Sequence, residues 1–186
     1  MSGLINGIRL VAGLIDRINE FVGQILAWLA LLLVLNVFMV VVLRYLFSSG
    51  DVWMQETYIW MHAFVFMLGA GFTLLHDGHV RIDLIYSGAS DRYKAFVNFF
   101  GSIFLAAPVL WLIYARGMDF FYRSFSRLET SPEAGGLPAL YILKGVIPAL
   151  AIFLGLQVFS MAIRSLDTII TGERVRLVED EDEPLT

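Results

Sequence analysis

The stretch FVGQILAWLALLLVLNVFMVVVL, residues 21–43, decides the fold, because its 23 residues include no charged side chain. The hydrocarbon core of a bilayer is about 30 Å thick, and a helix needs about 20 apolar residues to cross it. Three more uncharged stretches of similar length follow, at residues 57–75, 95–115 and 145–163. Backbone groups in lipid must form hydrogen bonds within their own segment, so each stretch is predicted to be a helix. We therefore expect an all-α integral membrane protein with four transmembrane helices in one domain, residues 21–170.

The composition of the whole chain agrees with a membrane protein. Of its 186 residues, 58% are hydrophobic and 16% are charged, whereas soluble domains average roughly 45–50% apolar and about 25% charged residues. The chain has no cysteine, which excludes disulfides, thiolate metal sites and cysteine nucleophiles. It also has no basic stripe of the kind that nucleic acid binding requires.

Two terminal segments, residues 1–20 and 171–186, flank the membrane domain. The first carries apolar side chains at helical spacing, which predicts an amphipathic helix; the apolar positions are Leu4, Ile8, Val11, Ile15 and Ile18. This helix either lies at the membrane interface or continues into the first span, and the sequence leaves both open. The second segment includes five consecutive acids at 179–183, which predicts a solvated, disordered tail.

The distribution of Lys and Arg predicts the orientation in the membrane. If the N-terminus is cytoplasmic, the inner side holds eight Lys and Arg residues and the outer side holds five. Cytoplasmic segments of membrane proteins carry the excess of positive charge. We therefore expect a multi-pass protein with both termini and the acidic tail in the cytoplasm. Residues 44–56 and 116–144 then lie on the outer face, and residues 76–94 lie on the inner face.

No Asp, Glu, Lys or Arg lies inside the four uncharged stretches. Ion and proton paths usually depend on such residues, despite a cost of at least about 2.5–3.5 kcal/mol each. The chain alone is poorly equipped to energise transport, so we expect an accessory subunit without catalytic residues, metal ions or cofactors. His62 keeps one alternative open, the membrane anchor of a haem- or quinone-linked oxidoreductase, because haem can be held by axial histidines. Against this alternative, the other three spans contain no histidine.

Charged residues close the first span and open the second. Arg44 ends the first span, Glu56 begins the second, and residues 47–55 connect them. We expect the two side chains to pair and to pin the helix ends, with Glu56 also favoured by the dipole at its helix N-terminus. Trp53 lies one turn before Glu56, where it would anchor the helix at the membrane interface. These three residues are predicted assembly contacts.

The segment HDGHVRID, residues 76–83, follows the second span and is dense in titratable groups. Its spacing matches no zinc motif, and Arg81 stands among the residues that would have to bind the metal. Gly78 instead predicts the C-terminal turn of a helix. We expect a hydrogen-bonded structural loop whose assembly contacts are His79, Arg81 and Asp83.

The connection between the third and fourth spans carries a charged helical face. Charged residues recur there at helical spacing, so the third helix is predicted to continue beyond the membrane. Ser131-Pro132 and Gly135-Gly136 are expected to break it, and Pro138 is expected to begin the fourth helix. An exposed charged face is a natural docking surface for an extracytoplasmic partner. The predicted docking residues are Arg116, Asp119, Arg123, Arg127 and Glu129.

The motifs at the helix ends, in their order along the chain, resemble the small membrane subunit, of DctQ type, of tripartite ATP-independent periplasmic (TRAP) transporters. The matching motifs are RYLF at 44–47, WMQE at 53–56, GAGF at 69–72, HDGHVRID at 76–83 and, in the second half, Pro138, Lys144, Pro148 and Gln157. Each motif alone is weakly specific, and their order on a chain with four spans is more specific. The resemblance covers about residues 20–170.

The resemblance implies a non-enzymatic subunit of a three-part transporter in the cytoplasmic membrane of a bacterium or archaeon. It implies that a large multi-span subunit carries the substrate, coupled to a sodium gradient, and that a soluble periplasmic binding protein delivers it. The small subunit would pack against the stationary part of the large one, amid membrane lipids, and help to dock the binding protein. The expected substrates are organic acids, including carboxylates and sialic acids.

Overall fold

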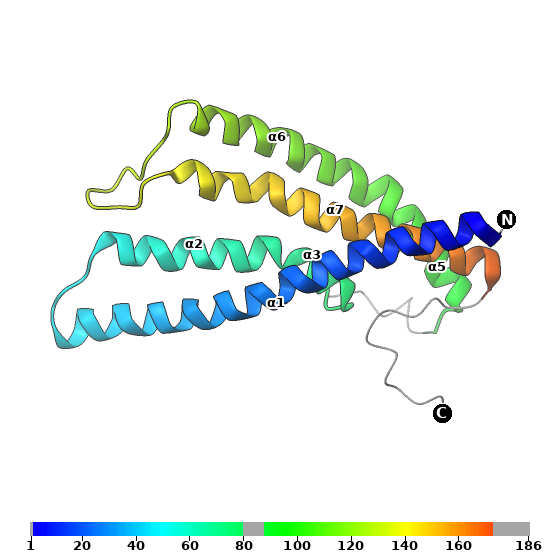
Figure 1. Ribbon diagram of the computed structural model, residues 1–186, viewed down its shortest axis with the longest axis horizontal. Helices are drawn as coiled ribbons and strands as arrows, with labels where there is room; N and C mark the ends of the chain where they lie inside the picture. Colours follow the sequence, from blue (N-terminus) through cyan, green and yellow to red (C-terminus); the bar gives the residue numbers. More distant parts are fainter. Residues whose placement is uncertain (1, 80–87, 173–186) are drawn as a thin grey trace.

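The computed structural model describes residues 2–79 and 88–172, with side chains from Gly7 onward, and the regular structure in these residues is helical (Figure 1). The helices in chain order are α1 (Ser2–Leu46), α2 (Val52–Leu68), α3 (Ala70–Leu75), α5 (Asp91–Gly101), the π-helical η1 (Ser102–Ala106), α6 (Ala107–Phe125) and α7 (Leu140–Thr171). Among the described residues, four stretches are long and apolar enough to cross a membrane: Gly7–Leu46, Val52–Leu75, Asp91–Phe125 and Leu140–Thr171. The prediction of an all-α protein with four spans is confirmed. The acids of the predicted tail, in residues 173–186, lie outside the described residues.

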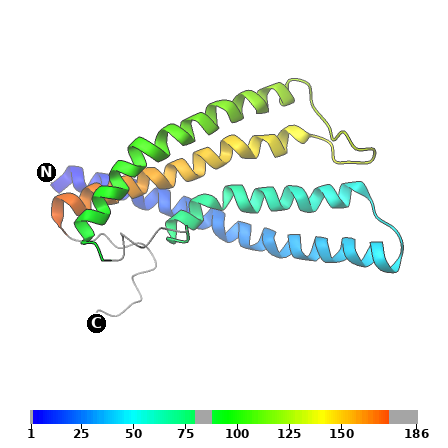
Figure 2. The same ribbon diagram turned by 180° about the vertical axis from the view of Figure 1, so that it is seen from behind.

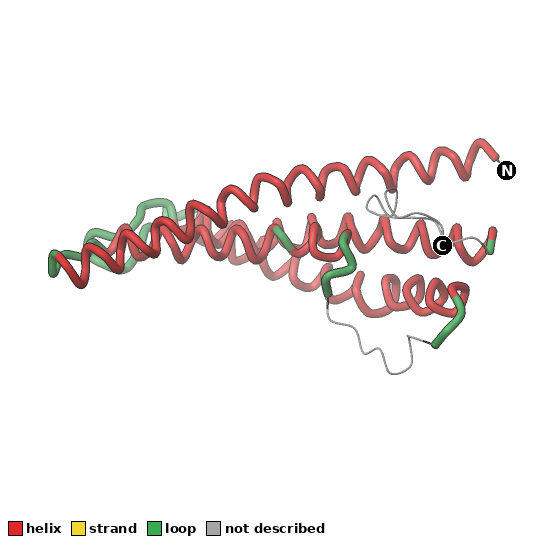
Figure 3. Tube along the Cα trace, turned by 90° about the horizontal axis from the view of Figure 1, so that it is seen from below, coloured by secondary structure: helices red, strands yellow, loops and turns green. Residues whose placement is uncertain are grey.

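The central helix of the fold is α7, which contacts α1, α2, α3, α5, η1 and α6. The connection 47–51 and the loop 126–139 lie at one end of the molecule, hereafter the loop end (Figure 1). The N-terminus and the end of α7 lie at the opposite end, hereafter the terminal end (Figure 2). There, α7 lies between α1 and α5 (Figure 3).

The first span and the N-terminal segment form one unbroken helix, α1, of 45 residues. Its length is about 67 Å at the helical rise of about 1.5 Å per residue. Of the two alternatives that the sequence left open, the structure therefore shows the continuous helix. The packing face of its terminal half differs from the predicted apolar stripe: Ile8 and Val11 are exposed, whereas Asp16 and Asn19 are buried. The polar side chains face inward because they find hydrogen-bonding partners on α7.

The GAGF motif near the end of the second span lets that span pack closely on α1 and α7. A Cβ atom at Gly71 would overlap Asn19 Oδ1 of α1 and lie 2.9 Å from the carbonyl oxygen of Phe153 in α7. Phe72, the next residue, fills the space beside Gly23 of α1, where a Cβ atom would overlap the phenyl ring. The absence of a side chain at these two glycines therefore sets the distance between three helices.

Two prolines inside the spans have different local effects. The π-helical turn η1 ends just before α6, whose second residue is Pro108, and an irregular turn accommodates the missing N–H and the ring of a proline. By contrast, α7 continues through Pro148 without interruption. The proline ring packs against α6 at Gly117, where an added Cβ atom would lie 3.1 Å from Pro148 Cδ. Of these two prolines, Pro108 therefore adjoins an irregular helical turn and Pro148 does not.

Candidate functional site

Glu56 pairs with the loop between α6 and α7, and not with Arg44. Its carboxylate accepts hydrogen bonds from Ser131 Oγ and from the backbone N–H of Leu137, the latter at 2.5 Å. Arg44 is exposed, and no ion pair among the described residues joins it to Glu56. The predicted pairing is wrong because the loop folds back over the start of α2 and offers two part-buried donors, whereas an exposed ion pair contributes only about 0–1 kcal/mol.

The loop over Glu56 is itself a hydrogen-bonded structure. The N–H of Ser131 donates to the carbonyl oxygen of Leu137 at 3.1 Å, which closes the loop on itself. Gly135 has a φ of +79°, a conformation that favours glycine. A Cβ atom at Gly136 would overlap Ser131 Oγ and lie 2.8 Å from Glu56 Oε1. The Gly-Gly pair that was predicted to break the helix thus also lets the loop close on Glu56.

A second carboxylate, that of Glu129, fixes the start of α7. Lys144 Nζ lies 2.5 Å from Glu129 Oε2 and 4.3 Å from the centre of the Phe120 ring. The hydrogen bond from Lys144 lowers the pKa of Glu129 from its ordinary value, because a donor to the carboxylate favours its charged form. The helix begins at Leu140, two residues after the predicted start at Pro138, because Ala139 adopts a left-handed backbone conformation with a φ of +65°. The N–H of Leu140, which has no partner within the helix, donates to the carbonyl oxygen of Glu129 at 2.8 Å.

Replacing Glu56 with alanine is expected to free the loop and to lower the free energy of unfolding by about 1–3 kcal/mol, because two donors lose their acceptor. Limited proteolysis of the purified protein should show faster cleavage in residues 126–139, and the melting temperature should fall. Glu133→Ala is the matched control, since Glu133 is an exposed acid of the same loop. Equal cleavage rates for the two variants would contradict the role of Glu56.

The predicted docking residues lie in the loop-end half of α6 and just beyond it. Four of them are exposed: Arg116, Asp119, Arg123 and Arg127. The fifth, Glu129, is half-buried and paired with Lys144. The structure thus places four exposed charged side chains along the last three turns of α6 and at the start of the loop that two carboxylates hold in place.

The other predicted assembly contacts are partly described. Trp53 is exposed in the first turn of α2, and His79 is exposed beyond the end of α3. The predicted turn after the second span is present, because the N–H of Gly78 donates to the carbonyl oxygen of Thr73 at 2.8 Å, but the positive φ falls on Asp77. The remaining two residues lie outside the described residues: Arg81 and Asp83.

A buried polar cluster at the terminal end joins α1 to α7, and the sequence patterns did not predict its charged members. Asp16 and Asn19 of α1 are both 0% exposed. The Asp16 carboxylate accepts hydrogen bonds from three side chains of α7: Gln157 Nε2 at 2.9 Å, Ser160 Oγ at 2.7 Å and Arg164 Nη2. Asn19 Nδ2 donates to the side-chain oxygen of Gln157 at 2.8 Å. A buried carboxylate is stable only with partners of this kind.

Two further pairs flank the buried polar cluster. Arg9 Nε and Nη2 lie 2.7 and 3.1 Å from the two carboxylate oxygens of Asp167, a forked geometry that arginine is suited to form. His76 Nε2 lies 3.2 Å from Glu20 Oε2, which joins α1 to the end of α3. The terminal half of α1 is therefore held by polar contacts over about three helical turns.

A complementary charge pattern is the signal that could have revealed these contacts. Arg9 and Asp16 lie seven residues apart on α1, and their partners Asp167 and Arg164 follow in the reverse order on α7. Because the two helices run in opposite directions, this order lets both pairs form on one face. All four residues lie outside the uncharged stretches, so the absence of charges inside those stretches still holds.

A comparison with known protein families identifies the type of protein. The family model for the DctQ component of tripartite ATP-independent periplasmic transporters matches residues 33–168. The chain belongs to this family. It is therefore the small membrane component of a TRAP transporter and not an enzyme, and the resemblance of the end motifs is confirmed. No curated protein and no solved structure matches the chain.

The family match of this DctQ component covers most of the fold. It begins at Leu33 in the loop-end half of α1 and ends at Thr168 near the end of α7, so it includes Glu56 and the loop that covers it. Membership in a transporter family leaves the oxidoreductase alternative without support. His62, on which that alternative depended, is exposed on α2 and stacks against Phe66 with 6.3 Å between the ring centres.

Proposed function

We propose that this DctQ component is an accessory scaffold subunit, which packs against a large transport subunit and helps to dock a periplasmic solute-binding protein. Family membership supports the proposal, because TRAP transporters are tripartite. In this proposal the binding protein docks at the loop end, where Glu56 and Glu129 fix the loop that follows α6 and its four exposed charged side chains. In this proposal the termini are cytoplasmic, so that the loop end meets the binding protein in the periplasm, and the complex takes up organic acids together with sodium ions.

The exposed apolar face of α1 is the proposed contact with the large subunit. Large apolar side chains recur along it every three to seven residues, and each is about half exposed or more: Leu10, Leu14, Phe21, Ile25, Trp28, Leu32 and Leu35. Side chains at this spacing form one stripe along a helix, and such a stripe packs into the groove of a neighbouring helix. From Leu10 to Leu35 the stripe is about 38 Å long at the helical rise of about 1.5 Å per residue, which exceeds the thickness of about 30 Å of the hydrocarbon core.

Reversing the charge of two docking residues, Arg123→Glu together with Arg127→Glu, is expected to weaken binding of the solute-binding protein. The physical reason is the loss of complementarity with acidic side chains of that protein. Two exposed contacts of about 0.2–1 kcal/mol each correspond to a roughly two- to thirtyfold higher Kd. Surface binding assays with the purified membrane complex, and solute uptake by reconstituted vesicles, measure the effect.

The matched control is Arg92→Glu, which reverses an exposed charge of α5 at the terminal end. Co-purification with the large subunit is expected to be unchanged in both variants, because all three arginines are exposed and none of them lies on α1. Normal docking and uptake by the Arg123/Arg127 variant would count against this docking surface. A solitary subunit, beside a large subunit that transports fully without it, would contradict the accessory role itself.

A further inference from the structure

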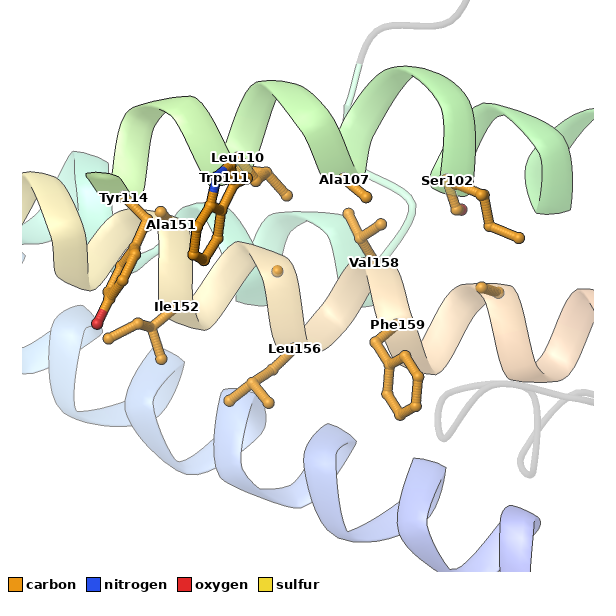
Figure 4. Close-up of a pocket in the computed structure, with 13 residues that line it drawn as sticks. Ser102, Ala107, Leu110, Trp111, Tyr114, Ala151, Ile152, Leu156, Val158 and Phe159 are labelled. Atoms are coloured by element: carbon orange, nitrogen blue, oxygen red, sulfur yellow. The ribbon is translucent and has the colours of Figure 1, made fainter. Parts of the chain in front are cut away.

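An apolar groove runs along α6 and α7, with η1 at its terminal end (Figure 4). It has a volume of about 500 Å³, and no charged residue lines it. Trp111 and Phe159 stand on its two sides and are 69% and 55% exposed. The residues between the large side chains are small: Ala107, Ala151, Gly155 and Ala162.

Among the small residues of the groove, Gly155 leaves space and does not serve close packing of the two helices. A Cβ atom at Gly155 would meet nothing closer than Leu110 Cδ1 at 3.9 Å. Two other glycines do allow close packing of α6 and α7. A Cβ atom at Gly117 would lie 2.9 Å from Ile147, and one at Gly145 would lie 3.2 Å from a phenyl ring. The π-helical turn η1 adjoins the groove, and such turns are frequent at functional sites.

The dimensions of the groove fit one hydrocarbon chain. Its lining on α7 runs from Ala151 to Ala162, which is about 16 Å at the helical rise, so the volume corresponds to a mean cross-section of about 30 Å². A helix with its side chains is at least about 10 Å across, which corresponds to about 80 Å². The groove is therefore too narrow to take in a whole helix of a protein partner.

The groove opens at the depth of the hydrocarbon core. Its lining residues fall within 102–114 and 151–162, inside the uncharged stretches 95–115 and 145–163. The side chains that line an empty apolar groove lack van der Waals contacts on its open side. The neighbouring molecules at this depth are the acyl chains of lipids, which can supply these contacts. We propose that the groove between α6 and α7 binds an acyl chain of a membrane phospholipid.

The test places the full-length subunit in nanodiscs of phosphatidylcholine that carries a photoreactive diazirine near the end of one acyl chain. After illumination, mass spectrometry is expected to find more label on peptides 102–114 and 151–162 than on the exposed α1 peptide 28–39. The variant Ala107→Phe with Gly155→Leu fills the groove. It is expected to reduce this label at least about tenfold, which corresponds to about 1.4 kcal/mol.

The matched control is Ala27→Phe, because Ala27 is exposed on α1 away from the groove. It should leave the label in the groove unchanged, and an unaltered melting temperature of the filled variant should show that the bundle is intact. Label on the groove peptides no stronger than on α1, or unchanged by filling, would overturn the proposal. Loss of the label when the large subunit is added would also overturn it, because a protein side chain would then occupy the groove.

Discussion

Replacing Asp16 with alanine is expected to lower the free energy of unfolding by about 3–5 kcal/mol, because breaking a buried ion pair leaves the other charge without its partner. Gln157, Ser160 and Arg164 all donate to this carboxylate. Each buried donor that loses its acceptor costs about 1–3 kcal/mol. The contact between the terminal half of α1 and α7 depends on these donors, so we expect this half of α1 to separate from the bundle first.

Denaturant unfolding of the purified subunit in detergent, followed by tryptophan fluorescence, measures the loss at Asp16. Asp119→Ala is the matched control, since Asp119 is an exposed acid on α6 and such changes stay within about 0.5 kcal/mol. The double variant Asp16→Leu with Arg164→Met should recover much of the stability, because apolar side chains can replace a buried ion pair at little cost. If Asp16→Ala unfolds at the same denaturant concentration as Asp119→Ala, the cluster has no stabilising role.

The four spans were predictable because the membrane imposes a simple rule on composition. A stretch of about 20 residues without charge has few alternatives to a transmembrane helix, and each of the four stretches lies within one of the four membrane-crossing segments of the structure. The same rule does not determine where the first helix begins. The uncharged stretch starts after Glu20, whereas α1 starts at Ser2, and charged side chains of this extension are paired with α7 and with the end of α3.

The partner of Glu56 was not predictable from the charge pattern. The sequence predicted Arg44 as the partner of Glu56, because it is the nearest cation on the same side of the membrane. The actual donors are a hydroxyl group and a backbone N–H, at Ser131 and Leu137, which lie 75 and 81 residues further along the chain. The sequence does not show which backbone N–H donates to a side chain, so only the folded loop reveals that the N–H of Leu137 donates to Glu56.

The GAGF motif illustrates a different gap between sequence and structure. The motif contributed to the family resemblance, but its two glycines had no assigned physical role. In the structure Gly71 lies where α3 meets both α1 and α7. The size of its side chain therefore controls the packing of three helices, and this can be tested by adding atoms at that position.

Gly71→Leu is expected to lower the free energy of unfolding by more than about 3 kcal/mol, beyond the usual range for overpacking. Its Cβ would overlap Asn19 Oδ1 and approach the backbone oxygen of Phe153, which cannot rotate away as a flexible side chain can. Gly13→Leu on α1 is the matched control, because a Cβ atom there meets nothing within 4 Å.

The two leucine variants should change stability in opposite directions. Leucine is a better helix former than glycine by roughly 0.5–1 kcal/mol, so Gly13→Leu is expected to hold or raise the melting temperature while Gly71→Leu lowers it. Adding Asn19→Ala removes one of the two obstructing groups, so Gly71→Leu should cost less in that background than in the native chain. The backbone oxygen of Phe153 remains, so the rescue should be partial. Equal melting temperatures for the Gly71 and Gly13 variants would show that α3 is free to move away, and that this glycine does not set the helix spacing.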